Sequence, residues 1–131
     1  MTALDRPASR WFMVAAWVAA NVWLSSQSTV PVPGVPGIDK GLHAIEYAIL
    51  AFLLARAIFP RLRRLPAARR WAIVVIGCFL YGIFDEAHQA FVPNRSCDPL
   101  DVVADASGAL LLALALLALR RQPWLGRVGV D

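Results

Sequence analysis

Apolar residues in this chain are gathered into four blocks, not spaced at the period of a water-facing helix or strand. The blocks cover residues 11–25, 42–59, 71–91 and 100–119, and charged or proline-rich sequence separates them. Each block is close to the ~20 residues that an α-helix needs to cross a bilayer. The pattern therefore predicts an all-α membrane protein, built as a bundle of four transmembrane helices.

Proline and arginine mark where the expected helices stop. Residues 29–37 read TVPVPGVPG, which is too rich in Pro and Gly for a helix or a central strand. Pro60 ends the second block, and a strongly basic connection over residues 61–70 follows it. These short connections leave no residues for a second folding unit, so we expect residues 1–131 to form a single transmembrane domain.

The first block has a second interpretation, as a cleavable signal peptide. Arg6 and Arg10 would supply the positively charged start, and Ser26 and Ser28 are small enough for a cleavage site. However, the block contains three tryptophans and an asparagine, which are unusual in a signal peptide. We therefore expect a retained helix, and both interpretations place its arginines on the cytoplasmic side.

Composition supports the membrane assignment, and the distribution of charge predicts an orientation. Hydrophobic residues make up 59% of the chain and charged residues 17%, below the ~25% that is usual in soluble domains. The net charge is +4, but the basic residues are segregated: all except Lys40 and Arg95 lie before the first block, around the second-to-third connection or after the fourth block. The positive-inside rule then predicts an N-in/C-in topology, with no nucleic-acid partner.

Polar residues enter the apolar blocks mainly from the outer end of the expected bundle. Spacings of three and four residues place their side chains on shared helix faces. In chain order they are Lys40, His43, Glu46 and Tyr47, then Asp85, Glu86, His88 and Gln89, then Arg95, Asp98, Asp101 and Asp105. Charges inside a membrane cost about 2.5–3.5 kcal/mol each on insertion scales, so such groups face the bundle interior and pair. The sequence thus predicts one polar cluster at the outer membrane face.

Three interpretations of this cluster stay open. In the first interpretation the cluster is purely structural: Lys40 and Arg95 pair with Glu86, Asp98 or Asp101. Either Asp98 or Asp101 then also caps the fourth helix. In the second, the cluster is an acid/base or head-group-binding site. In the third, it binds a divalent metal. No HExxH motif, cysteine pair or close ligand spacing supports the third, so we expect no metal and no cofactor.

The order of these polar residues resembles the VanZ-like family of bacterial membrane proteins. The matching segments, within residues 39–114, are Asp39-Lys40-x-x-His43-x-x-x-Tyr47, Glu86-x-x-Gln89, Pro93-x-Arg95 and Asp101-x-x-x-Asp105-x-x-Gly108. Asp105 departs from the family pattern, which usually has asparagine there. Asp85 and His88 are not required by the pattern, so any role they have is particular to this chain.

The resemblance implies a multi-pass protein of the bacterial cytoplasmic (inner) membrane with a role in the cell envelope, since the family is named for a member linked to teicoplanin resistance. We expect a pocket that binds an envelope lipid, a lipid-linked precursor or a glycopeptide antibiotic. The alternative is a small intramembrane enzyme acting on a lipid head group, with Glu86 or His43 as base and Arg95 holding a phosphate. Transport is not favoured, because the sequence shows no inverted repeat or broken helix pair.

If the cluster is a site of this kind, the polar residues divide into catalytic and ligand-binding candidates. The candidate catalytic residues are His43, Glu86, Arg95 and Asp101. The residues expected to bind the ligand are Lys40, Glu46, Tyr47, Asp85, His88, Gln89 and Asp105. Membrane lipids are the expected partners, and a homodimer is considered because four helices are few to enclose a pocket.

Overall fold

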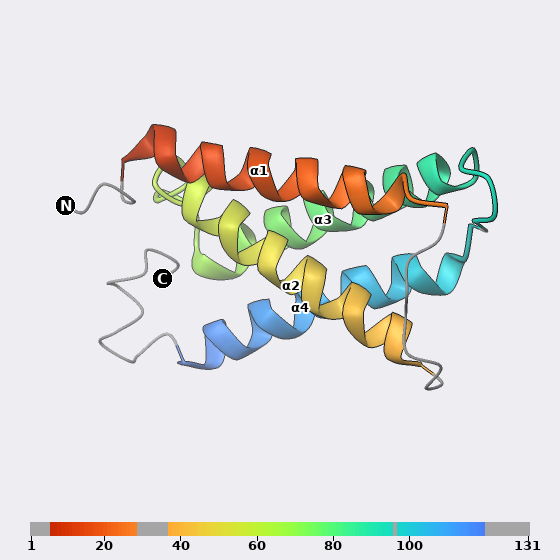
Figure 1. Ribbon diagram of the computed structural model, residues 1–131. Helices are drawn as coiled ribbons and strands as arrows, with labels where there is room; N and C mark the ends of the chain where they lie inside the picture. Colours follow the sequence, from red (N-terminus) through yellow and green to blue (C-terminus); the bar gives the residue numbers. More distant parts are fainter. Residues whose placement is uncertain (1–5, 29–36, 96, 120–131) are drawn as a thin grey trace.

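The computed structural model describes residues 6–28, 37–95 and 97–119 (Figure 1). Four α-helices follow one another along these ranges, α1 (Pro7–Ser25), α2 (Ile38–Ile58), α3 (Ala67–Gln89) and α4 (Pro99–Leu119). The helices α2, α3 and α4 are each long and apolar enough to cross a membrane, whereas α1 is not. Arg10 and Asn21 lower the hydropathy of α1. The expectation of four helices is confirmed, and three of them have the length and apolar composition of a membrane span.

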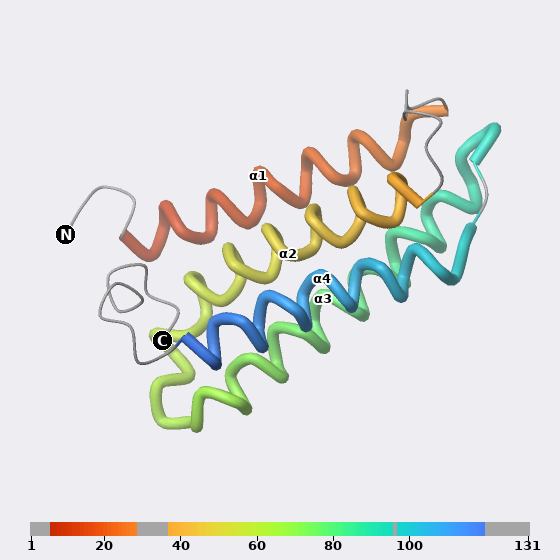
Figure 2. The backbone as a smooth tube through the Cα atoms, turned by 90° about the horizontal axis from the view of Figure 1, so that it is seen from below, coloured from red at the N-terminus to blue at the C-terminus, as the bar shows by residue number. Residues whose placement is uncertain are grey.

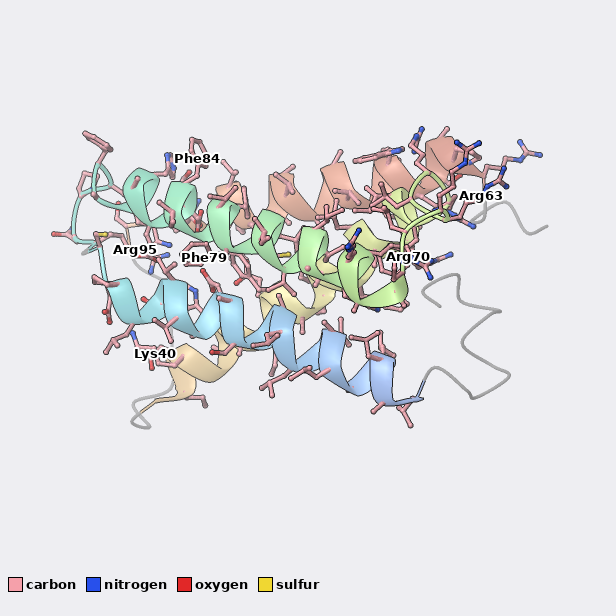
Figure 3. The ribbon with its side chains drawn as sticks, turned by 180° about the vertical axis from the view of Figure 1, so that it is seen from behind. Lys40, Arg63, Arg70, Phe79, Phe84 and Arg95 are labelled. Carbon is pink, nitrogen blue, oxygen red and sulfur yellow. The ribbon has the colours of Figure 1, made fainter. Side chains whose placement is uncertain are left out.

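Successive helices run in opposite directions beside one another, so the helix ends lie together at the two ends of the bundle (Figures 1 and 2). The start of α1, the end of α2 and the start of α3 lie at one end, which we call the basic end because it carries Arg63 and Arg70 (Figure 3). The end of α1, the start of α2 and the α3–α4 connection lie at the other, which we call the polar end because it carries Lys40 and Arg95. The arginine-rich segments among the described residues therefore lie at one end of the bundle, and the cluster of mixed polar residues lies at the other.

The helices α2 and α4 form the most extensive contact in the bundle. Gly108 on α4 permits their close approach, because a Cβ at this position would overlap the backbone of Ala44 on α2. Small residues at a helix crossing are a common way for membrane helices to pack. Around the crossing lies the buried core, formed by Tyr47, Leu50, Ala51, Ala55, Phe59, Trp71, Val74, Cys78, Ala109, Ala113 and Leu116.

Large apolar side chains cover the outside of the bundle. Phe79 and Phe84 on α3 are 42% and 62% exposed, and Phe84 points away from the other helices in Figure 3. At the basic end, the guanidinium of Arg61 lies 5.7 Å from the ring centroid of Trp11. A contact between arginine and an aromatic ring suits the membrane–water interface, where the apolar ring lies against lipid and the guanidinium reaches the charged head groups. The outer surface is therefore matched to lipid.

The connection between α3 and α4 folds back onto α3. Asn94 lies in it with a φ of 62°, a conformation that asparagine adopts more readily than most residues. Asp98 ends the connection, and its Oδ1 accepts a hydrogen bond from the backbone N–H of Leu100 at 2.9 Å. Pro99 takes the first helical position, where its missing N–H has no cost. Of the two aspartates predicted to cap the fourth helix, Asp98 is the one that does so.

Candidate functional site

The helices α2, α3 and α4 bring many of the predicted polar residues to one cavity at the polar end. The cavity has a volume of about 630 Å³ and lies largely between α1 and α2. The candidate residues that line it are Lys40, His43, Glu46, Asp85, Gln89, Arg95 and Asp101. The remaining candidates, Glu86, Asp105, Tyr47 and His88, are not among its lining residues, and each lies behind or beside those that are.

Lys40 is the cation that holds the start of α4 to the start of α2. Its Nζ lies 2.5 Å from Asp98 Oδ2 and 2.5 Å from Asp101 Oδ1. These contacts confirm the predicted pairing of Lys40 with the two aspartates. The hydrogen bonds from the Lys40 ammonium and the Leu100 N–H hold the pKa of Asp98 below its ordinary value.

His43 is held in one orientation by a carboxylate from α4. Its Nδ1 lies 3.0 Å from Oδ1 of Asp105, and the side chain of Asp105 is fully buried. The other ring nitrogen, Nε2, lies 3.8 Å from Asp101 Oδ2, which is too far for a hydrogen bond. An ionised carboxylate accepts only, so Nδ1 carries the proton in this pair and a neutral His43 keeps the lone pair on Nε2.

Glu86 is a buried carboxylate with one oxygen satisfied. Its Oε2 accepts a hydrogen bond from the backbone N–H of Asp98 at 2.8 Å, whereas Oε1 has no partner among the described residues. The residue is 2% exposed. Single ligand-type atoms of Glu86, His43 and Asp101 lie within 4.8 Å of one another, so these side chains from three helices converge on one point.

Arg95 does not form the predicted ion pair with an acidic residue. Within residues 6–28, 37–95 and 97–119, its guanidinium donates from Nη2 to the carbonyl oxygen of Leu24, at 3.4 Å, and no carboxylate pairs with it. The connection after α3 brings the guanidinium of Arg95 to the end of α1. The expectation that both outer cations pair with the acids is therefore wrong for Arg95.

The helix α1 supplies polar residues to the site that the sequence analysis did not include. Ser25 Oγ donates to Asp85 Oδ1 at 2.7 Å, and Gln89 Nε2 donates to Asp85 Oδ2 at 3.1 Å. Asn21 is 2% exposed and lines the cavity. Asn21 and Ser25 are four residues apart, a spacing that places both on one face of α1. That spacing within an apolar block was the signal that would have identified them.

Two candidate residues lie away from the cavity. Tyr47 is buried in the core, with its ring centroid 5.9 Å from that of Tyr81. His88 faces the end of α1, where its Nε2 lies 3.1 Å from Ser26 Oγ. Within the described residues, their contacts are to neighbouring helices, so both serve the packing around the site.

The cavity has one polar end and an apolar wall. Its polar end is formed by the cluster around Lys40 and His43, and the wall is formed by side chains from α1 and α2. The apolar lining residues are Trp17, Ala20, Leu24, Leu42, Ile45 and Ile49. Trp17 also joins the two helices, because its indole N–H donates to the carbonyl oxygen of Glu46 at 3.2 Å. The arrangement suits a molecule with a polar head and an apolar tail.

Comparison with known families shows where the chain belongs. A family model described as VanZ/LLP1 matches residues 6–120. The chain belongs to the VanZ/LLP1 family. The match includes the whole of α1, so it covers more of the chain than the resemblance over residues 39–114. No curated protein and no solved structure matches the chain.

Membership of the VanZ/LLP1 family agrees with the fold. Three helices of this VanZ/LLP1 protein are apolar and long enough to cross a bilayer, and the family assignment spans all of them. The chain is therefore a VanZ-like membrane protein. The candidate site lies within the matched residues, at the junction of α1 with the two helices α2 and α3 and the start of α4.

Proposed function

We propose that this protein is an envelope factor that binds an amphiphilic molecule in the cavity between α1 and α2. The observation that carries the proposal is the pairing of a charged end with an apolar wall in one cavity. A head group would contact Lys40, His43 and Arg95, and a tail would lie along Leu24 and Ile45. Envelope lipids, lipid-linked precursors and glycopeptides with an acyl tail, such as teicoplanin, share this chemistry.

The proposal also includes a location in the bacterial cytoplasmic membrane with an N-in/C-in topology. Hydrogen bonds tie α1 to the bundle at both ends, from Arg10 Nη1 to the Arg56 carbonyl oxygen and from Ser25 Oγ to Asp85. By its own composition α1 is not a candidate span. A helix tied to its neighbours at both ends shares their membrane slab, however, so α1 would cross together with α2, α3 and α4. The arginines of the basic end would then face the cytoplasm.

Labelling of the two cysteines tests this orientation. Cys97 is exposed at the polar end and Cys78 is buried in the core. We expect a membrane-impermeant maleimide, added outside spheroplasts, to label Cys97 and not Cys78. Partial desolvation and the nearby Glu86 carboxylate raise the pKa of the Cys97 thiol, so a mildly alkaline buffer is used to form the reactive thiolate. Labelling of Cys97 only after lysis would show the opposite orientation.

Filling the apolar wall tests the binding proposal. Ala20 lines the cavity and is exposed, so Ala20→Trp should place a ring in the groove. We expect the variant to retain phosphatidylglycerol, measured by native mass spectrometry in detergent, about tenfold less than wild type. Its matched control is Ala19→Trp, which is also exposed but does not line the cavity. Equal lipid retention in the two variants would contradict binding in this cavity.

An enzymatic role is a second candidate, favoured by the orientation of His43. His43 lines the cavity, and the Asp105 carboxylate holds its ring at Nδ1; a histidine held in this way is an arrangement used by general bases. The same mass spectra separate the two functions. An envelope factor releases the bound lipid with its mass unchanged, whereas an enzyme acting on the head group converts it to a species of different mass.

A further inference from the structure

We infer that His43, Glu86 and Asp101 bind one divalent transition-metal ion, most suitably Zn²⁺, at the polar end of the cavity. The sequence analysis expected no metal, because each residue lies on a different helix and no spacing along the chain marks the three as ligands of one ion. In the folded protein, one ligand atom from each lies within 4.8 Å of the others. One imidazole nitrogen and two carboxylate oxygens form a ligand set that zinc accepts.

The separation of the ligand atoms fits an ion between them. His43 Nε2 and Asp101 Oδ2 are 3.8 Å apart, too far for a direct hydrogen bond. Two ligands on one zinc ion, each about 2.0–2.2 Å from it, lie about 3–4 Å apart. The pair is therefore spaced as two ligands of a common ion would be.

Each ligand is also fixed by an outer contact that leaves an atom free for the ion. Asp105 holds His43 through Nδ1, the Asp98 N–H holds Glu86 through Oε2, and Lys40 holds Asp101 through Oδ1. A carboxylate behind a histidine ligand is a common outer shell of zinc sites, where it sets the tautomer and the ring orientation. Ligand orientation here does not require the ion, so the site is preorganised.

Burial supplies an independent reason for a cation at this point. Glu86 is 2% exposed, and its Oε1 has no partner in the described part of the chain. A buried carboxylate oxygen without a partner loses its hydration and gains nothing in exchange, which destabilises the ionised group. Among the described residues, Lys40 is the one Lys or Arg paired with the acids of the polar end, and its contacts go to Asp39, Asp98 and Asp101. A divalent ion would offset the charge that remains on Glu86.

The metal site would also define the chemistry of the ligand. Three protein ligands leave at least one coordination position open. Both His43 and Asp101 line the cavity, so that position would face a bound head group. An anionic oxygen, as in a phosphate or carboxylate head group, is the ligand it would take. This extension rests on the proposed function, whereas the metal site itself does not.

Direct measurement of metal binding tests the inference. The full chain, purified in lipid-free detergent and treated with EDTA, is titrated with ZnCl₂ by calorimetry, and its zinc content is measured by mass spectrometry after desalting. We expect one Zn²⁺ per chain. His43→Gln and Asp101→Asn should each weaken binding about 100-fold or more, and Asp105→Asn about 10–100-fold through loss of the outer contact. His88→Gln is the matched control, since this second histidine contacts Ser26 and is not in the group.

Circular dichroism is used to check that each variant keeps its helices. Zinc binding by EDTA-treated wild-type protein tests the site without any substitution. Zinc content that is equal in wild type and His43→Gln, or no binding by wild type, would overturn the metal site. Lipid retention is measured separately, so a protein that binds zinc but not phosphatidylglycerol would overturn the proposed function and leave the metal site standing.

Discussion

Gly108→Ala is expected to destabilise the protein by about 3 kcal/mol or more, because the added methyl group has no space at the α2–α4 crossing. The three atoms that it would meet first are backbone atoms of Ala44. Backbone cannot rotate away as a side chain can, so α2 and α4 must separate. The same separation would move His43 away from Asp105, which lies one turn before Gly108 on α4.

The measurement is thermal unfolding in a mild detergent, followed by size-exclusion chromatography or tryptophan fluorescence. Gly77→Ala is the matched control on α3, where the new Cβ would lie 3.6 Å from a Leu54 methyl group in ordinary contact. We expect little change for the control and a large fall in midpoint temperature for Gly108→Ala. Similar midpoints for both variants would show that the helices are not as closely packed as described.

Lys40→Met is expected to cost about 2 kcal/mol, between the ~1 kcal/mol of an exposed ion pair and the 3–5 kcal/mol of a buried one. The side chain of Lys40 is 30% exposed and that of Asp101 14%, so the pair is partly screened by solvent. Removal of the ammonium leaves Asp98 and Asp101 facing each other without a cation. Unfolding in detergent at neutral pH measures the loss.

Two companion variants identify the cause of that loss. Lys40→Arg keeps the charge and should retain most of the stability. Asp101→Asn combined with Lys40→Met should recover part of it, since the unpaired charge is then removed; simple additivity would show that the two residues do not interact. Because the folded pKa of Asp98 is below its ordinary value, its share of the stability is present at neutral pH and is lost as pH falls through that lowered pKa.

The sequence predicted the features that depend on spacing within one helix or on charge between helices. The polar end, the pairing of Lys40 with Asp98 and Asp101, and the cap at Asp98 all follow from local order along the chain. Each of these features needs only the topology of neighbouring helices. A positively charged residue at the start of one helix and acids at the start of another meet whenever both starts lie at the same end.

Features that depend on rotation and depth between helices were not predicted. The direction of Arg95 depends on how the turn at Asn94 carries the chain, which residue types alone do not specify. The contribution of Ser25 to Asp85 depends on how α1 is rotated about its axis against α3. The sequence predicted that His43, Glu86 and Asp101 share one polar cluster, but not that single atoms of the three approach within 4.8 Å. That approach requires three helices in one register, to which the close contact of Gly108 with Ala44 contributes for α2 and α4.

The apolar wall of the cavity has a consequence for how a ligand would arrive. Leu24, Leu42 and Ile45 line the cavity and are also 40%, 48% and 60% exposed on the outside of the bundle. In a bilayer this side would face acyl chains, and under the proposed function the entrance would open sideways into the leaflet. Occupancy would then follow the mole fraction of the ligand among its neighbouring lipids, not its concentration in water. A soluble head group without a tail should compete weakly, because it cannot take that lateral route.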